Sequence, residues 1–89
     1  MKDSITVQIK YLASLRDRTG RRQEEVTFPA GATLGDVAGW LNRRYGLSLP
    51  SPQVMAVLNG RGWEQFPARL STEVGEGDVI ALFPPLAGG

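Results

Sequence analysis

The chain has 89 residues, enough for one domain with a modest core, and hydrophobic residues make up 42% of it. Its 10 basic and 9 acidic residues are interspersed and leave a net charge of +1, which argues against nucleic-acid binding because that needs clustered Lys and Arg. The absence of cysteine and histidine excludes disulfides, thiolate nucleophiles, imidazole bases and the usual zinc ligands, so we expect no metal site. No apolar run is long enough to span a membrane and no secretion signal opens the chain, so we expect a cytoplasmic protein without membrane contact.

The first third of the chain predicts two paired strands. Residues 5–11 alternate apolar and polar side chains, the period of a strand buried on one face. A second strand over 23–28 directs Val26 and Phe28 inward. Only a short helical turn, over 13–18, links the two strands, so they should pair antiparallel.

A single amphipathic helix follows. Thr33 and Asp36 form a capping-box-like pair at its start, and Gly46 is the expected left-handed stop. Gly35 and Gly39 flank its apolar stripe, where they either allow close packing or are tolerated at a cost in stability. The stripe consists of Leu34, Val37, Ala38, Leu41 and Tyr45.

The second half predicts three more strands. Residues 54–58 and 79–83 are apolar at both parities, as in strands covered on both faces. Asn59-Gly60 is a turn signal, with 63–66 as a short return strand at an edge. One helix can cover only one face of the resulting sheet, so the other face should carry an exposed apolar patch of the kind that marks a partner site.

Alternation along the last strand divides its side chains between these faces. Val79, Ala81 and Phe83 lie on one face, and Ile80 and Leu82 on the other. We predict that Phe83 faces outward, because it adjoins a tail that a partner would hold.

That tail is the most distinctive stretch of the chain. We divide the sequence into a folded domain over 1–83 and an extended tail over 84–89. Pro84 and Pro85 cannot continue a sheet and favour an extended path, so the tail can reach about 20 Å. Gly88 and Gly89 leave the terminal carboxylate unhindered. Such a tail can thread a narrow channel and present one reactive carboxylate, although a frayed, inert end is the alternative.

Four motifs in order carry a family resemblance. They are YLASLR at 11–16, LNG at 58–60, GDVI at 77–80 and LFPPLAGG at 82–89. With them the chain resembles the ubiquitin-like β-grasp fold, an α+β architecture with a mixed sheet of four to five strands and one main helix on one face. More closely, it resembles the small sulfur-carrier subunits of molybdopterin synthase in the MoaD/ThiS group. Leu86 departs from the valine common in that group.

The resemblance implies a carrier rather than an enzyme, with no bound cofactor. An adenylating enzyme related to the ubiquitin E1 enzymes would activate the Gly89 carboxylate with ATP, and a sulfurtransferase would convert the adenylate to a thiocarboxylate. The large subunit of molybdopterin synthase would then receive the tail and supply the catalytic side chains. Gly89 would carry the sulfur next to Gly88. The residues expected to bind partners are Phe83, Pro84, Pro85, Leu86, Ala87 and Arg16.

Two other readings remain open. The chain could carry sulfur for another product (thiazole, cysteine or a thio-metabolite) or be a ubiquitin-like modifier joined to lysines through Gly89. It could also be a β-grasp binding module whose tail is inert.

Overall fold

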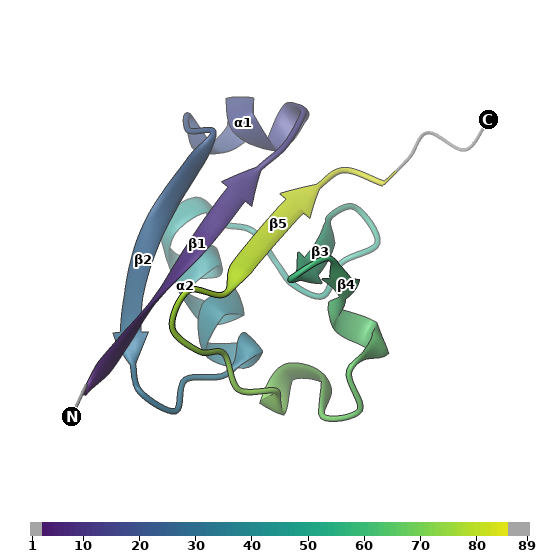
Figure 1. Cartoon of the computed structure of the whole chain (residues 1–89). Helices are drawn as coiled ribbons and strands as arrows, with labels where there is room; N and C mark the ends of the chain where they lie inside the picture. Colours follow the sequence, from purple (N-terminus) through teal and green to yellow (C-terminus); the bar gives the residue numbers. More distant parts are fainter. Residues whose placement is uncertain (1–2, 86–89) are drawn as a thin grey trace.

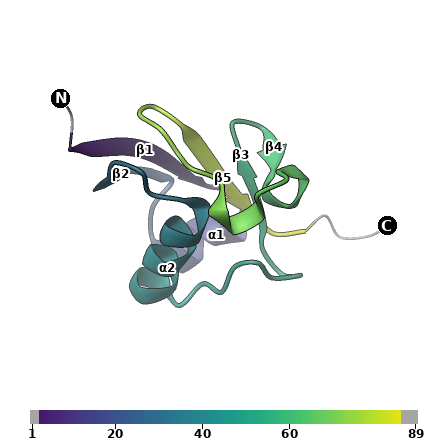
Figure 2. The same cartoon turned by 90° about the horizontal axis from the view of Figure 1, so that it is seen from below.

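The computed structural model describes residues 3–85 and shows a mixed sheet with one main helix beneath it (Figures 1 and 2). The strands are β1 (Ser4–Tyr11), β2 (Gln23–Pro29), β3 (Met55–Leu58), β4 (Arg61–Gly62) and β5 (Val79–Phe83). The helices are α1 (Ser14–Thr19), α2 (Leu34–Tyr45) and the 3₁₀ turns η1 (Trp63–Gln65) and η2 (Arg69–Ser71). Within residues 3–85, no helix is long and apolar enough to cross a membrane.

The five strands lie in the order β2-β1-β5-β3-β4. β1 pairs antiparallel with β2, as predicted, and parallel with β5 at the centre of the sheet. β3 pairs antiparallel with β5 on one side and with β4 on the other. The predicted mixed sheet with one covering helix is therefore confirmed.

Helix α2 begins and ends at the residues that the sequence predicted. Thr33 and Asp36 make a complete capping box, and Gly46 takes the left-handed conformation at the C-terminal end with φ 71°. Leu34, Val37, Ala38 and Leu41 are buried against the sheet, whose inner face supplies Val7, Ile9, Tyr11, Ile80 and Leu82.

The two helix glycines have different surroundings. A Cβ at Gly35 would lie 3.2 Å from the carbonyl oxygen of Leu70, so this glycine permits the close approach of η2. A Cβ at Gly39 would meet only the guanidinium of Arg43, a flexible side chain that can move away. Close packing therefore explains Gly35, whereas Gly39 is tolerated.

The predicted return strand over 63–66 is wrong. Asn59 and Gly60 both have positive φ (51° and 85°), which gives the two-residue hairpin turn that pairs Leu58 directly with Arg61. The return strand thus begins immediately after the turn and ends at Gly62. Trp63 then starts η1 and is buried, because its large apolar ring is more stable in the core than at a sheet edge.

A polar cluster joins β1, β2 and the end of α2. The Glu24 carboxylate accepts hydrogen bonds from the hydroxyls of Tyr11 (2.7 Å) and Tyr45 (2.5 Å), and the two rings meet edge to face. Burial, followed by the hydrogen bond to Glu24 and its charge, raises the pKa of Tyr11 well above the ordinary tyrosine value. The folded protein therefore holds Tyr11 in its neutral form.

We expect this cluster to make the folded protein less stable as the pH rises into the alkaline range. Above about pH 10 the unfolded chain releases the Tyr11 proton while the folded chain keeps it, so the free energy of unfolding should fall by up to about 1.4 kcal/mol per pH unit. Urea unfolding between pH 8 and pH 11 measures this slope. Tyr11→Phe should be less stable than the wild type at pH 8, and its free energy of unfolding should decrease less per pH unit above pH 10. An unchanged slope would contradict the assignment to Tyr11.

Candidate functional site

The end of β5 organises the candidate site. Ile80 and Leu82 are fully buried against the helix side of the sheet, so Val79, Ala81 and Phe83 point to the opposite, outer face. This confirms the prediction that Phe83 faces outward. Its side chain is half-buried, which leaves part of the ring exposed beside the start of the tail.

Strand register gathers further apolar side chains around Phe83. Met55 on β3 lies directly opposite Phe83, and Val57 lies directly opposite Ala81. On the other side, Tyr11 pairs with Leu82, so Leu12 follows on the outer face beside Phe83, and its N–H donates to the carbonyl of Leu82. We name this surface the sheet patch and define it as Leu12, Met55, Val57, Ala81 and Phe83.

The exposure of the sheet patch is unusual for its side chains. Leu12 is 44% exposed and Met55 38%, and they are two of the three exposed large hydrophobic residues found within residues 3–85. The third, Leu70, lies elsewhere, on η2. Because the two lie on either side of Phe83, they form a contiguous surface rather than scattered positions, and contiguous apolar surfaces mark sites of protein–protein contact.

The rest of the outer face is polar. Over β1 and β2 it carries Thr6, Gln8, Lys10, Glu25 and Thr27, joined in part by hydrogen bonds between side chains. The apolar side chains of the outer face therefore lie over β3 and β5 and at the end of β1, where Leu12 follows. The tail starts from the same end of β5 (Figure 1).

The tail begins at the edge of the sheet patch. Pro84 and Pro85 follow β5 without joining any strand, because they have no N–H to donate to a neighbouring strand. Pro85 is exposed. The other tail residues predicted to act, Leu86, Ala87, Gly88 and Gly89, lie outside the described residues. Their roles stay predictions, as does the division into a domain over 1–83 and a tail over 84–89.

Arg16 lies on α1, at the end of the sheet where β1 and β5 finish (Figure 1). It is exposed and lines a shallow hollow with Arg21 and Arg22. Arg21 approaches the Glu24 carboxylate at 3.8 Å, whereas no ion pair or hydrogen bond is found for the Arg16 side chain within residues 3–85. Its position is compatible with contact to a partner that holds the tail, and the predicted role of Arg16 remains a prediction.

Residues 3–85 hold no group of three or more acidic side chains placed to bind a metal ion. The two tyrosines with raised pKa values, Tyr11 and Tyr45, belong to the cluster around Glu24, on the helix side of the sheet. The candidate site is therefore the sheet patch beside the start of the tail.

Comparison with known proteins identifies the family. The profile of the ThiS family matches residues 9–89, nearly the whole chain and all of the tail. The chain belongs to the ThiS family. Its sheet patch and tail are therefore those of a small ubiquitin-like β-grasp protein related to sulfur carriers.

Individual relatives of this ThiS-family chain extend the comparison. The molybdopterin synthase sulfur carrier subunit of Mycobacterium tuberculosis (strain ATCC 25618 / H37Rv) is 35% identical over 89 residues, covering 96% of this chain and 99% of that protein. A putative molybdopterin converting factor subunit 1 from Pyrococcus furiosus has 26% identity and a TM-score of 0.75, covering 92% of this chain and 99% of that one. The small archaeal modifier protein 1 of Haloferax volcanii has 25% identity and a TM-score of 0.70 over 92% and 99% of the two chains.

Sequence reasoning placed Phe83 and Ala81 on one face of the sheet but missed Leu12, Met55 and Val57. Leu12 interrupts the alternation of the first strand, and this break was the available signal that an apolar side chain turns outward there. Met55 could not be assigned, because residues 54–58 are apolar at both parities and only the register with β5 decides which side chains face outward.

Proposed function

We propose that this protein is the sulfur carrier of molybdopterin synthase, and that its Gly89 carboxylate is the group that is activated and carries the sulfur. The observation that carries the proposal is the sheet patch, which lies beside the start of a tail ending in Gly88-Gly89. The 35% identity to a molybdopterin synthase sulfur carrier subunit across nearly the whole chain supports this pathway over others.

The chemistry follows from the terminus. An E1-like enzyme uses ATP to form an acyl adenylate on Gly89 and releases pyrophosphate. A persulfide on the sulfurtransferase then attacks the carbonyl carbon, so the C–S bond forms and the bond to AMP breaks. A second thiol cleaves the S–S bond of the resulting acyl disulfide, which releases the thiocarboxylate and leaves a disulfide on the thiol side. Because neither Gly88 nor Gly89 carries a Cβ, the carbonyl is open to this attack.

In this proposal the folded domain provides the surface that partner proteins recognise. The sheet patch gives a partner an apolar surface next to the tail, and Pro84 and Pro85 restrict the conformations that the tail loses on capture. The large subunit of the synthase then takes the tail into its active site and transfers the sulfur to a cyclic pyranopterin, using its own side chains.

The formation of a thiocarboxylate tests this function. Protein produced with its activating enzyme and a sulfur donor should increase in mass by the difference between one sulfur and one oxygen atom, located on Gly89 by fragmentation. A known carrier treated in parallel is the control. An unchanged mass, when the control is converted, would contradict the proposal.

A second function is favoured by the similarity to the small archaeal modifier protein 1. In this alternative Gly89 is joined to lysine side chains, or the sulfur goes to another product. Recovery of the large synthase subunit with the chain supports the first function, and lysine-linked adducts support modification. A β-grasp module with an inert tail would show neither.

A further inference from the structure

The fold separates charges that are interspersed in the sequence. Four segments meet at the end of the sheet where β1 and β5 finish and the tail starts: the end of β1, helix α1, the turn into β2 and the end of α2 (Figure 1). Their basic side chains are Lys10, Arg16, Arg18, Arg21, Arg22 and Arg44. We call this set the basic end.

Contacts between these segments bring the end of α2 to the same place as α1. The Arg18 guanidinium donates a hydrogen bond of 3.2 Å to the carbonyl of Gly46, the residue that follows α2. The Arg44 guanidinium lies 5.5 Å from the centre of the Tyr45 ring, and the Tyr45 hydroxyl reaches Glu24 at the start of β2. The six cations therefore lie at one end of the molecule.

Few carboxylates balance these cations. Within residues 3–85 the basic end holds two, Asp17 on α1 and Glu24 on β2, and Glu24 already accepts hydrogen bonds from two tyrosine hydroxyls. No ion pair or hydrogen bond is found in this part of the chain for the side chains of Lys10, Arg16 and Arg22. Six cations and two carboxylates leave an excess of four positive charges at the end from which the tail starts.

The opposite end of the molecule is acidic. Glu76 accepts the N–H of Thr6, near the start of β1, at 3.0 Å, and Glu73 pairs with Thr33, the residue before α2. The net charge of +1 is therefore the sum of two ends of opposite sign. The carboxylates of the acidic end are Asp3, Asp36, Glu73, Glu76 and Asp78.

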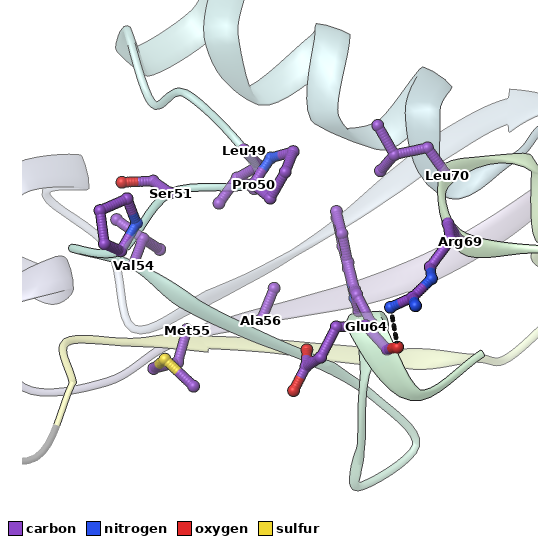
Figure 3. Close-up of a pocket in the computed structure, with 11 residues that line it drawn as sticks. Leu49, Pro50, Ser51, Val54, Met55, Ala56, Glu64, Arg69 and Leu70 are labelled. Carbon is purple, nitrogen blue, oxygen red and sulfur yellow. Dashed lines mark hydrogen bonds between the residues drawn. The ribbon is translucent and has the colours of Figure 1, made fainter. Parts of the chain in front are cut away.

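The remaining arginines lie away from the basic end. Arg69 donates a hydrogen bond to the backbone carbonyl of Glu64 in the groove beside β3 (Figure 3). Arg61, on β4, donates to the carbonyl of Gln65. Arg43 extends back along α2, toward the acidic start of that helix. The positive excess found within residues 3–85 is therefore confined to the basic end.

This charge separation indicates a partner surface of negative sign. Charges at an interface act mainly on the rate of encounter, because they attract and orient the partner before contact. With ends of opposite sign, the carrier turns its basic end, and with it the start of the tail, toward an acidic surface. A nucleic acid fits less well, because Asp17 and Glu24 lie among the arginines and repel phosphates.

We propose that the activating enzyme presents a surface rich in Asp and Glu to the basic end as it takes up the tail. This inference rests on the proposed function, in which that enzyme adenylates Gly89. Adenylation is the first step for a sulfur carrier and for a modifier joined to lysines, so both functions require this partner. The carrier must then leave the enzyme, and attraction between charges serves such a complex because it speeds association without slowing dissociation.

Stopped-flow measurement of association between the full-length chain and its activating enzyme tests the proposal. The association rate constant should fall by roughly 10–100-fold when NaCl is raised from about 20 mM to about 500 mM, because salt screens the attraction. At about 100 mM NaCl, Arg22→Glu and Lys10→Glu should each lower it by roughly 3–10-fold and change the dissociation rate constant less. Neither side chain makes a bond within residues 3–85 that the fold would lose.

Arg43→Glu is the matched control. It changes the net charge by the same amount as Arg22→Glu, and its side chain is also exposed but lies outside the basic end. Its association rate constant should stay within about twofold of the wild type, because screening at this salt concentration limits each charge to its surroundings. Equal losses for the two variants would overturn the proposal, and so would a wild-type rate constant that does not depend on salt.

Two other occupants of the basic end are tested separately. Sedimentation of the chain alone at low salt should show a monomer. A dimer that disappears in Arg22→Glu would assign the basic end to the acidic end of a second copy and would overturn the proposal. Binding of a single-stranded RNA oligonucleotide as tightly as the enzyme would overturn it as well.

Pyrophosphate release distinguishes failure of this inference from failure of the proposed function. A wild-type chain that supports no pyrophosphate release by the enzyme in the presence of ATP would refute the proposed function, and this inference with it. Normal release, together with wild-type association rate constants for Arg22→Glu and Lys10→Glu, would refute this inference alone.

Discussion

Removal of Gly88 and Gly89 is expected to abolish thiocarboxylate formation without changing the stability of the folded body. The truncated chain would end at Ala87, so its carboxylate would carry a neighbouring Cβ and stand about 7 Å short of its normal position. Both changes act at the reacting carbonyl, where a displacement of even 1 Å costs a large factor in rate. Intact-mass measurement after incubation with the activating enzyme, ATP and a sulfur donor gives the result.

The stability part of this prediction rests on the sheet. β5 is paired with β1 up to Leu82 and with β3 up to Phe83, and no hydrogen bond is found for Pro84 or Pro85 within residues 3–85. The melting temperature of the truncated chain should therefore match that of the full chain. A fall of more than about 5 °C, which corresponds to about 1 kcal/mol for a domain of this size, would show that the tail packs on the body. Gly89→Ala is the control that keeps the length and adds only a methyl group.

Leu12→Asp is expected to weaken binding to the activating enzyme and to the large synthase subunit by roughly 10–100-fold. The substitution places a carboxylate in the sheet patch, where a partner would have to remove it from water without a compensating charge. Leu12 is 44% exposed and its backbone bond to Leu82 remains, so the fold should persist. Titration by calorimetry or surface plasmon resonance measures the loss.

Thr27→Asp provides the matched control for the sheet patch. Thr27 is exposed on the same outer face of the sheet but lies over β2, in its polar half. The same charge added there should leave both affinities within about twofold of the wild type, since exposed polar positions outside an interface contribute little. Equal losses for the two variants would mean that net charge, and not the sheet patch, controls binding.

Local sequence signals determined much of this protein. The alternation of residues 5–11 and 23–28, the capping box of Thr33 and Asp36, and Gly46 each specify a local conformation that depends on nearby residues only. The tail is a local feature of the same kind, because Pro84, Pro85 and the terminal glycines owe their properties to their own backbones.

Where local signals were ambiguous, only the tertiary structure decided. Residues 54–58 and 79–83 are apolar at both parities, so their outward faces depend on pairing with each other and with β1, which is a long-range property. The position of Trp63 is explained by its burial in the core, and β4 ends before it, at Gly62. The sequence specified the tail and the helix by itself. The sheet patch arose only when strand register brought Leu12, Phe83 and Met55 together, because residues that are far apart in the chain become neighbours only in the folded sheet.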